Sequence, residues 1–175
     1  MSELLQGTTL EPRQRSHVDA IRRAGEHLLR LVNDALDLAR IEAGKLQLSN
    51  ADFALRPLLD EVAALVAPVA ERKGLAFIDG IAADAPAALH GDRTRVQQIL
   101  LNLVGNAVSH APDGATISVV LSPEGSLLVD NPAPHLGQED VARLRERFYR
   151  VDSGSRGSHA GLGLALSEAI AAILG

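Results

Sequence analysis

Apolar residues recur at helical spacing in DRTRVQQILLNLVGNAVSHAP, residues 92–112. Five of them form a broad face suited to covering a sheet, with Asp92 as the N-cap: Val96, Leu100, Leu103, Val104 and Ala107. The opposite stripe is polar and consists of Arg95, Asn102, Asn106, Ser109 and His110. The pattern therefore predicts an amphipathic helix that carries two carboxamides four residues apart.

A second helical pattern runs through residues 14–43. Apolar or small residues recur by sevens in two rows, which are Val18, Gly25, Val32, Ala39 and Ile21, Leu28, Ala35, with Leu29 and Leu36 widening the seam. An isolated helix would leave this seam in water. We therefore expect a homodimer through residues 14–43.

The rest of the chain alternates between shorter patterns. Strands are predicted at 45–55, 75–81 and 88–90, with a hairpin at 116–121 and 126–129. Helices are predicted at 56–72, 138–145 and 161–174, the one at 56–72 with Leu58, Leu59, Val62, Leu65 and Val66 inward. Residues 2–6 are too short for a helix, and 7–12 are typical of a turn. The predicted class is α+β, a two-layer α/β sandwich with antiparallel neighbouring strands. It comprises a helical part, 1–44, and an α/β domain, 45–175.

Composition narrows the function classes. Hydrophobic residues make up 46% of the chain but aromatic ones only 2%, so the core must be aliphatic, with Phe53 and Phe77 as its large fillers. A net charge of −5 without a basic run argues against a nucleic-acid partner. The absence of cysteine excludes disulfides and thiolate zinc sites and fits the cytoplasm. No run predicts a membrane span or a signal peptide, so no membrane contact is expected.

The two carboxamides combine with a glycine-rich turn downstream. An amide oxygen suits a hard cation, and its N–H groups suit a phosphate, without a charge that repels polyphosphate. In RERFYRVDSGSRGSHAGLGLALSEAI, Gly161 to Leu164 open an apolar helical run. Glycines at a helix start let backbone N–H groups approach phosphate oxygens.

These segments resemble the ATP-binding domain of sensor histidine kinases, in the superfamily that includes DNA gyrase, Hsp90 and MutL. Asn102 to Asn106 resembles the asparagine box, Phe148 the phenylalanine box and Gly161 to Leu164 the second glycine box. ALDLARIEAGKLQLSNADFAL resembles the end of a dimerisation hairpin and its exit into the catalytic domain. The resemblance implies a Bergerat-type fold, ATP and Mg²⁺ as cofactors, and transfer of the γ-phosphoryl group to a histidine and on to a response-regulator receiver domain.

The resemblance also implies roles for individual residues. Asn106 would coordinate Mg²⁺ with Asn102 close by, and Asn131 would meet the adenine. The phosphates would lie under a lid at 151–159, held by Arg150, Gly161, Leu162, Gly163 and Leu164. His110 or Ser109 replaces the family's basic residue after the second asparagine, and His110 could contribute as a donor.

The chain departs from the family in three places. The phosphoacceptor box is absent, so no catalytic histidine is assigned, and His17 and His27 are interpreted as exposed residues of the second hairpin helix. The first glycine box is replaced by residues 129–136. Counting back from Phe148 without gaps places Asn131 at the family's adenine-binding aspartate and Ala133 and His135 at its glycines, whereas sliding by one residue places Asp130 at the aspartate. We prefer Asn131, and Pro132 and Pro134 should stiffen this edge. The family's final strands are missing, which predicts an incomplete sheet.

Two other functions stay open at this point. A nucleotide-free or weakly binding dimerisation scaffold would explain the prolines in the altered box. A serine kinase or an ATPase of the same superfamily would share the pocket, although the heptad helix that ends in ARIEAGK argues against both.

Overall fold

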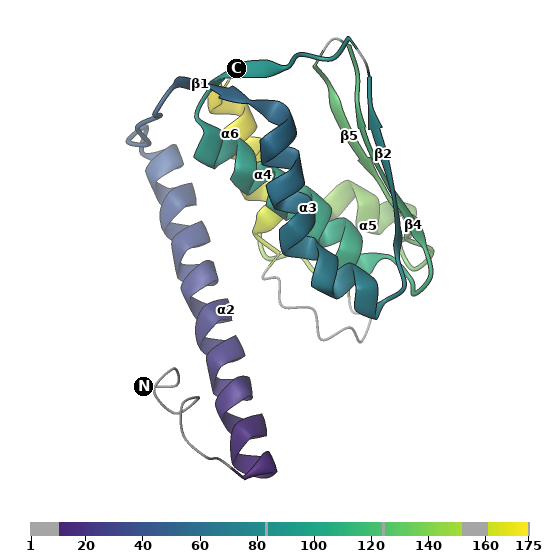
Figure 1. Cartoon of the computed structure of the whole chain (residues 1–175). Coiled ribbons are helices and arrows are strands. Elements are labelled where there is room, and N and C mark those ends of the chain that lie inside the picture. The colour runs from purple at the N-terminus through teal and green to yellow at the C-terminus, as the bar shows by residue number, and fades with distance from the viewer. Residues whose placement is uncertain (1–10, 83, 124, 152–160, 175) are drawn as a thin grey trace.

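The computed structural model describes residues 11–82, 84–123, 125–151 and 161–174. The predictions for residues 2–6, for residues 7–10 of the turn and for residues 152–159 of the lid at 151–159 lie outside these ranges, and Pro12, predicted in the turn, begins a helix instead. A long helix projects from an α/β domain (Figure 1). The elements in order are α2 (Pro12–Glu42), β1 (Ala51–Ala54), α3 (Leu55–Arg72), β2 (Ala76–Ile81), β3 (Ala88–Gly91), α4 (Arg93–His110), β4 (Thr116–Leu121), β5 (Leu127–Asp130), α5 (Gln138–Arg143) and α6 (Gly163–Leu174).

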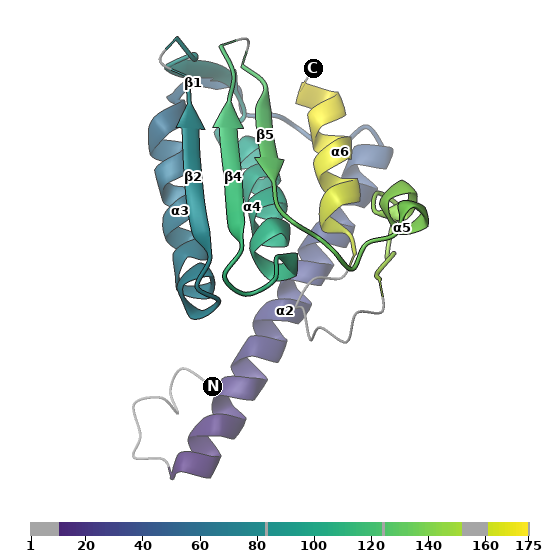
Figure 2. The same cartoon turned by 90° about the vertical axis from the view of Figure 1, so that its right-hand side faces the viewer.

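The strands form two sheets. β1 pairs antiparallel with β3, and a second sheet has the order β2-β4-β5. Helices α3 and α4 lie behind the three-stranded sheet, while α6 and α5 lie beyond β5 (Figure 2). The predicted two-layer α/β sandwich and the β4–β5 hairpin are thus confirmed.

The expectation of antiparallel neighbours was wrong for one pair. β2 and β4 run parallel, with Ala76 opposite Thr116 and Ile81 opposite Leu121. Parallel neighbours need a long crossover, and here β3 and α4 supply it. The sheet is therefore mixed.

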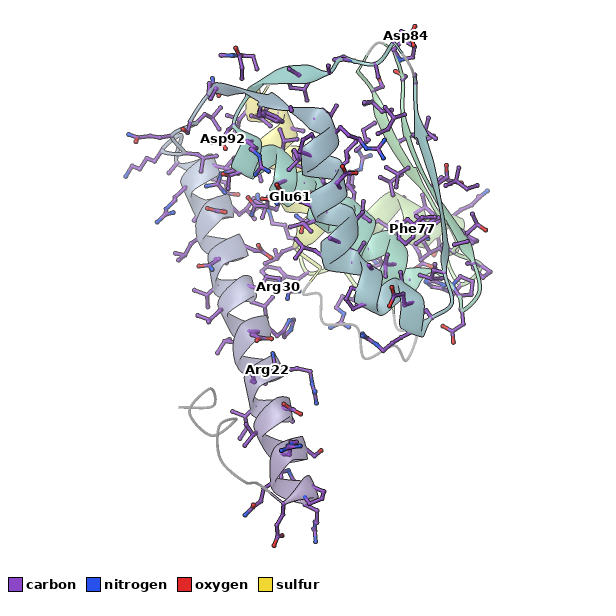
Figure 3. All side chains as sticks on the ribbon, in the orientation of Figure 1. Arg22, Arg30, Glu61, Phe77, Asp84 and Asp92 are labelled. Atoms are coloured by element: carbon purple, nitrogen blue, oxygen red, sulfur yellow. The ribbon has the colours of Figure 1, made fainter. Side chains whose placement is uncertain are left out.

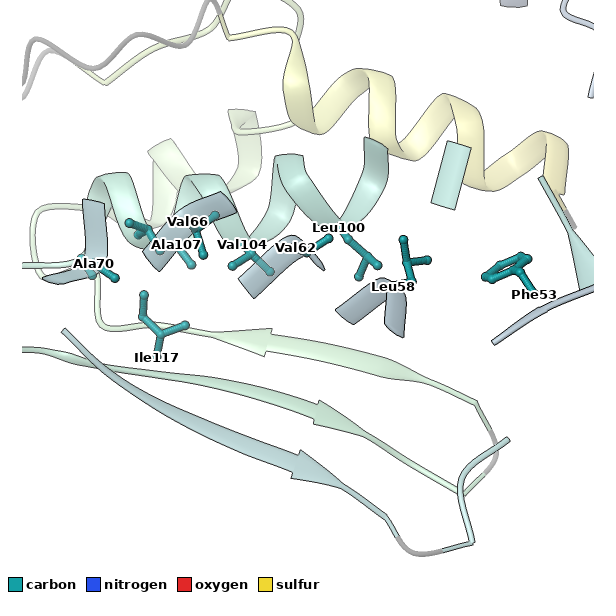
Figure 4. Packing of buried hydrophobic residues seen from close by; sticks show 11 residues of the cluster. Phe53, Leu58, Val62, Val66, Ala70, Leu100, Val104, Ala107 and Ile117 are labelled. Carbon is teal, nitrogen blue, oxygen red and sulfur yellow. The ribbon is translucent and has the colours of Figure 1, made fainter. Parts of the chain in front are cut away.

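The main core lies between the sheet and the helices α3 and α4 (Figure 4). Leu58 and Ile117 are fully buried, and Val62 and Val104 are nearly so. Phe53 closes one end of this core at 9% exposure, as predicted.

Two predicted core residues are on the surface instead. Leu65 is 61% exposed, because the buried stripe of α3 runs through Leu58, Val62 and Val66 and a helix turns about 100° per residue. Phe77 is 40% exposed on β2 (Figure 3). β2 is an edge strand of its sheet, so this ring has a neighbouring strand on one side only.

Asp92 caps α4 as predicted and has a second role. Its Oδ1 accepts a hydrogen bond from the Arg95 backbone N–H at 3.1 Å, and its Oδ2 accepts one from the Ser49 N–H at 2.9 Å. Burial raises the pKa of this carboxyl, but these backbone hydrogen bonds outweigh burial and leave the pKa below its usual value. The second bond holds residues 45–50, which form no strand, so the predicted strand at 45–55 is limited to β1.

Helix α2 confirms the long helix predicted from the heptads, and Gly44, with φ of 64°, follows its end. Its C-terminal part packs on the domain: Leu38 contacts a cluster of α6 residues, and Asp37 forms an ion pair with Arg95 at 2.6 Å. His17 is exposed as predicted, but the expectation that His27 is exposed was wrong, because its side chain is partly buried. Of the large seam residues, Val18 is only 9% exposed, whereas five others are 47–66% exposed, namely Ile21, Leu28, Leu29, Val32 and Leu36. No helix in the described ranges is long and apolar enough to cross a membrane.

Candidate nucleotide site

A pocket of about 260 Å³ opens between α4, the segment after β5 and the start of α6. Most of its wall is aliphatic, and a few polar groups converge on it, as is typical of small-molecule sites. It is lined by Leu103, Asn106, Ala107, His110, Val129, Asn131, Ala133, His135, Leu136, Leu144, Tyr149, Arg150, Val151, Gly161, Gly163 and Leu164.

Seven of the ten residues selected from the sequence line this one pocket, although they lie as far apart as 106 and 164 in the chain. Asn106 and His110 come from successive turns of α4, and Asn131 follows β5 directly. The other four are Arg150, Gly161, Gly163 and Leu164. The structure therefore brings the asparagine helix and the glycine-rich turn together.

The other three selected residues lie outside the pocket wall. The Asn102 amide donates to the Gly163 carbonyl oxygen at 3.1 Å and to Ser167 Oγ at 3.2 Å. Leu162 is 2% exposed and packs in the α6 cluster that contacts α2. Phe148 is 68% exposed and has a φ of 63°. Asn102 and Leu162 thus hold the turn at residues 161–164 in place from outside the pocket.

The turn at Gly161 requires glycine. Gly161 has a φ of 71°, and a Cβ built on it would lie 2.5 Å from the Tyr149 carbonyl oxygen. The Phe148 N–H donates to the Gly161 carbonyl oxygen at 2.9 Å, which joins the two segments that flank residues 152–160. At Gly163, where α6 begins, a Cβ would lie 3.4 Å from Asn102 Cγ. The backbone here has the close packing and helix N-terminus that suit an anion.

The other end of the pocket holds two histidines. The rings of His110 and His135 have centroids 6.1 Å apart and planes inclined by 31°. Burial lowers the pKa of His110, and the positive charges of His135, Lys73 and Arg150 lower it further. Lys73 Nζ caps the adjacent end of α4 by donating to the carbonyl oxygens of Val108, Ser109 and Ala111 at 2.9, 3.0 and 2.5 Å.

Sequence reasoning missed Tyr149, which the structure places in the pocket wall. Its hydroxyl donates to Asp140 Oδ1 at 2.6 Å, and the Arg143 guanidinium lies 4.2 Å from its ring centroid. The hydrogen bonds from Tyr149 and from the Gly137 N–H lower the pKa of Asp140. The sequence did carry a signal for Tyr149, because it stands between Phe148 and Arg150, which were both selected.

The other missed residues are Leu103, Ala107, Val129, Ala133, His135, Leu136 and Leu144, while Val151 also lines the pocket and belongs to the predicted lid. Ala133 and His135 had a signal, because they stand where the resemblance places the glycines of the first glycine box. The aliphatic lining residues had no such signal in the sequence, since the protein core and the pocket wall are built from the same residue types.

Comparison with known protein families identifies two segments. Residues 91–175 match the family described as histidine kinase-, DNA gyrase B-, and HSP90-like ATPase. Residues 1–44 match the His Kinase A (phospho-acceptor) domain.

Similar proteins are sensor kinases. The chain is 34% identical over 172 residues to the sensor protein GacS of Pseudomonas syringae pv. syringae, covering 94% of this chain and 19% of the relative. It is 35% identical over 167 residues to the signal transduction histidine-protein kinase BarA of Escherichia coli K12, covering 91% and 18%. The chain thus spans about a fifth of the length of these relatives.

Solved structures of histidine kinases are also similar to this chain. Full-length ShkA in complex with AMPPNP has a TM-score of 0.76 at 34% identity, covering 98% of this chain and 36% of that one. The Acinetobacter baumannii histidine kinase AdeS has a TM-score of 0.69 at 22% identity, covering 95% and 77%, which supports the fold.

Proposed function

Because this chain belongs to the sensor histidine kinase family, we propose that its pocket binds Mg-ATP and serves transfer of the γ-phosphoryl group to a histidine and then to a response-regulator receiver domain. The observation that carries the proposal is the convergence of Asn106, Asn131 and the turn at Gly161 and Gly163 on one pocket. Such catalysis depends on positioning and charge neutralisation.

The phosphate end is assigned to the start of α6. Backbone N–H groups at Gly163 and Leu164 lie at a helix N-terminus, where a negative charge is favoured. Arg150 adds a fixed positive charge in the same wall. Asn106 offers an uncharged oxygen for Mg²⁺, while the Asn102 amide is engaged with Gly163 and Ser167 and holds the turn beside the pocket.

The base end is assigned to the segment after β5. Asn131 lines the pocket and its amide donates to the Pro132 carbonyl oxygen at 3.2 Å, which leaves its side-chain oxygen to accept from an amino group. Asp130 is the last residue of β5, opposite Ser118, and is absent from the pocket wall. This supports Asn131 over Asp130 as the adenine contact.

The proposal extends to partners. We assign homodimerisation to residues 14–43, where most large side chains of the α2 seam are exposed in the part of the chain that the structure describes. A histidine kinase of similar fold, ThkA, has been solved in complex with the response regulator TrrA, at a TM-score of 0.56 and 20% identity. A receiver domain is the corresponding proposed partner here, and the cytoplasm, where ATP is supplied, the proposed compartment.

Calorimetry with Mg-AMPPNP tests the function. We expect weak, saturable binding that falls when Mg²⁺ is chelated, and Asn106→Ala should abolish the Mg-dependent part because water replaces the lost oxygen only partly. Asn50→Ala, at an exposed site in the 45–50 segment, is the matched control and should bind as wild type. No heat of binding at millimolar nucleotide would instead favour the nucleotide-free scaffold.

A further inference from the structure

The pocket has two distinct ends, which lie at different levels along helix α4. Asn102, against Gly163, marks the phosphate end, and Asn106 and His110 follow at successive turns. Eight residues of helix span about 12 Å, so His110 lies roughly that far from the level of the glycine turn. A nucleotide anchored by its phosphates at the turn would therefore extend its base toward His110.

Two imidazole rings meet at that end. His110 comes from the last turn of α4 and His135 from the segment after β5, and both line the pocket. Their centroid separation of 6.1 Å lies within the range of about 4.5–7 Å over which aromatic rings contact one another. Both side chains are exposed enough to shift, so a planar ring could stack on one imidazole or enter between the two after a small opening.

A metal ion is the other ligand that two histidines suggest, and the surroundings disfavour it. Within the described ranges, no group of three or more His, Cys, Asp or Glu residues could hold a metal. Lys73 and Arg150 place positive charge near His110, which repels a dication. Aliphatic wall residues near this end, such as Val129, Ala133 and Leu136, suit a flat organic ring instead.

The geometry points to His110 and His135 as a pair of stacking rings that hold the nucleobase, with His135 as a specificity residue that this chain adds. The inference rests on the proposed function, because it places the base of the same nucleotide. His135 stands where the resemblance expects a glycine, which has no side chain to offer a base. Stacking on the His135 ring therefore restores part of the affinity for the base that is lost because Asn131 lacks the charge of a carboxylate.

The test compares ring removal with ring replacement. Stacking on an aromatic side chain changes affinity by about fivefold to a hundredfold per base on alanine substitution. His135→Ala should weaken Mg-ATP binding by that order, while His135→Phe should stay within about threefold of wild type because the ring is kept. His90→Ala, on β3 beside Asp52, is the control for loss of an exposed histidine and should leave affinity unchanged.

Mg-tripolyphosphate, which has no base, separates base contacts from phosphate contacts. Its affinity should be the same in wild type, His135→Ala and His135→Phe. In NMR spectra, the ring protons of both histidines should move upfield with Mg-ATP and not with Mg-tripolyphosphate.

Each alternative outcome is recognisable. Equal Mg-ATP affinity in wild type and His135→Ala would overturn the ring pair alone and leave the proposed function standing. If His135→Phe loses as much as His135→Ala, with Mg-tripolyphosphate weakened too, the histidine acts through charge and the inference fails. Zn²⁺ binding at micromolar concentration that needs both histidines and displaces Mg-ATP would assign the pair to a metal. A wild-type chain that binds no nucleotide would overturn both the function and the inference.

Discussion

Gly161→Ala should damage the phosphate turn more than any other glycine replacement with the same backbone strain. Gly161 and Gly74 both have positive φ, 71° and 61°, so alanine at either site adds about 1–2 kcal/mol of left-handed strain. At Gly74 nothing lies within 4 Å of the added Cβ. At Gly161 the Cβ would meet Tyr149 O at 2.5 Å and Phe148 C at 2.9 Å, which are backbone atoms that must move.

Overpacking of this kind adds about 1–3 kcal/mol, so we expect Gly161→Ala to cost about 2–5 kcal/mol against about 1–2 for Gly74→Ala. In a chain of this size that corresponds to Tm decreases of about 6–15 °C and about 3–6 °C. If the clash is relieved by local displacement instead, the Tm loss will be smaller but Mg-AMPPNP binding will disappear.

Thermal unfolding followed by circular dichroism and calorimetry with Mg-AMPPNP measure the two effects on the same samples. Gly74→Ala should keep wild-type nucleotide affinity, because it lies outside the pocket wall. The reasoning is refuted if Gly161→Ala matches Gly74→Ala in both Tm and affinity.

Two further predictions concern α2. Changing both Leu28 and Val32, which are 62% and 47% exposed, to Glu should shift sedimentation toward monomer while leaving the catalytic domain folded, whereas a wild-type chain monomeric at high concentration would contradict the proposed seam. Asp37→Asn should lower the free energy of unfolding by about 1–2 kcal/mol at pH 7, because it removes the partner of Arg95. Burial raises the pKa of Asp37, but hydrogen bonds from Arg95 and Gln98 outweigh burial and lower it. The stabilisation is therefore present above the unfolded pKa of about 3.9 and lost as pH falls below it, so denaturant titrations of variant and wild type should converge in acid.

The features that could be predicted from sequence are local ones. The stripe of α4, its Asp92 cap and the heptad helix each depend on residues within a few turns of one another, and the structure has all three. The glycine-rich turn was readable because a helix N-terminus and its glycines are adjacent in the chain.

The features that could not be predicted from sequence depend on contacts between residues that lie far apart in the chain. The Leu65 position on α3 follows from where the sheet lies, and the exposure of Phe77 follows from β2 being an edge. The two asparagines share a helical stripe, yet Asn102 contacts Gly163 and Ser167 of α6 while Asn106 lines the pocket, because α6, distant in the sequence, packs against one part of this stripe. The approach of His135 to His110 joins two segments with no pattern in common.

Paramagnetic NMR tests the central claim most directly, that phosphates lie at the glycine turn with the metal beside Asn106. With Mn²⁺ in place of Mg²⁺ in the AMPPNP complex, the backbone amides of Gly161, Gly163 and Leu164 and the Asn106 side-chain amide should broaden strongly. The amides of β1, which pairs with β3 and not with the sheet beside the pocket, should keep their line widths. Strong broadening elsewhere with these four amides unaffected, or broadening that is the same without nucleotide, would contradict the account.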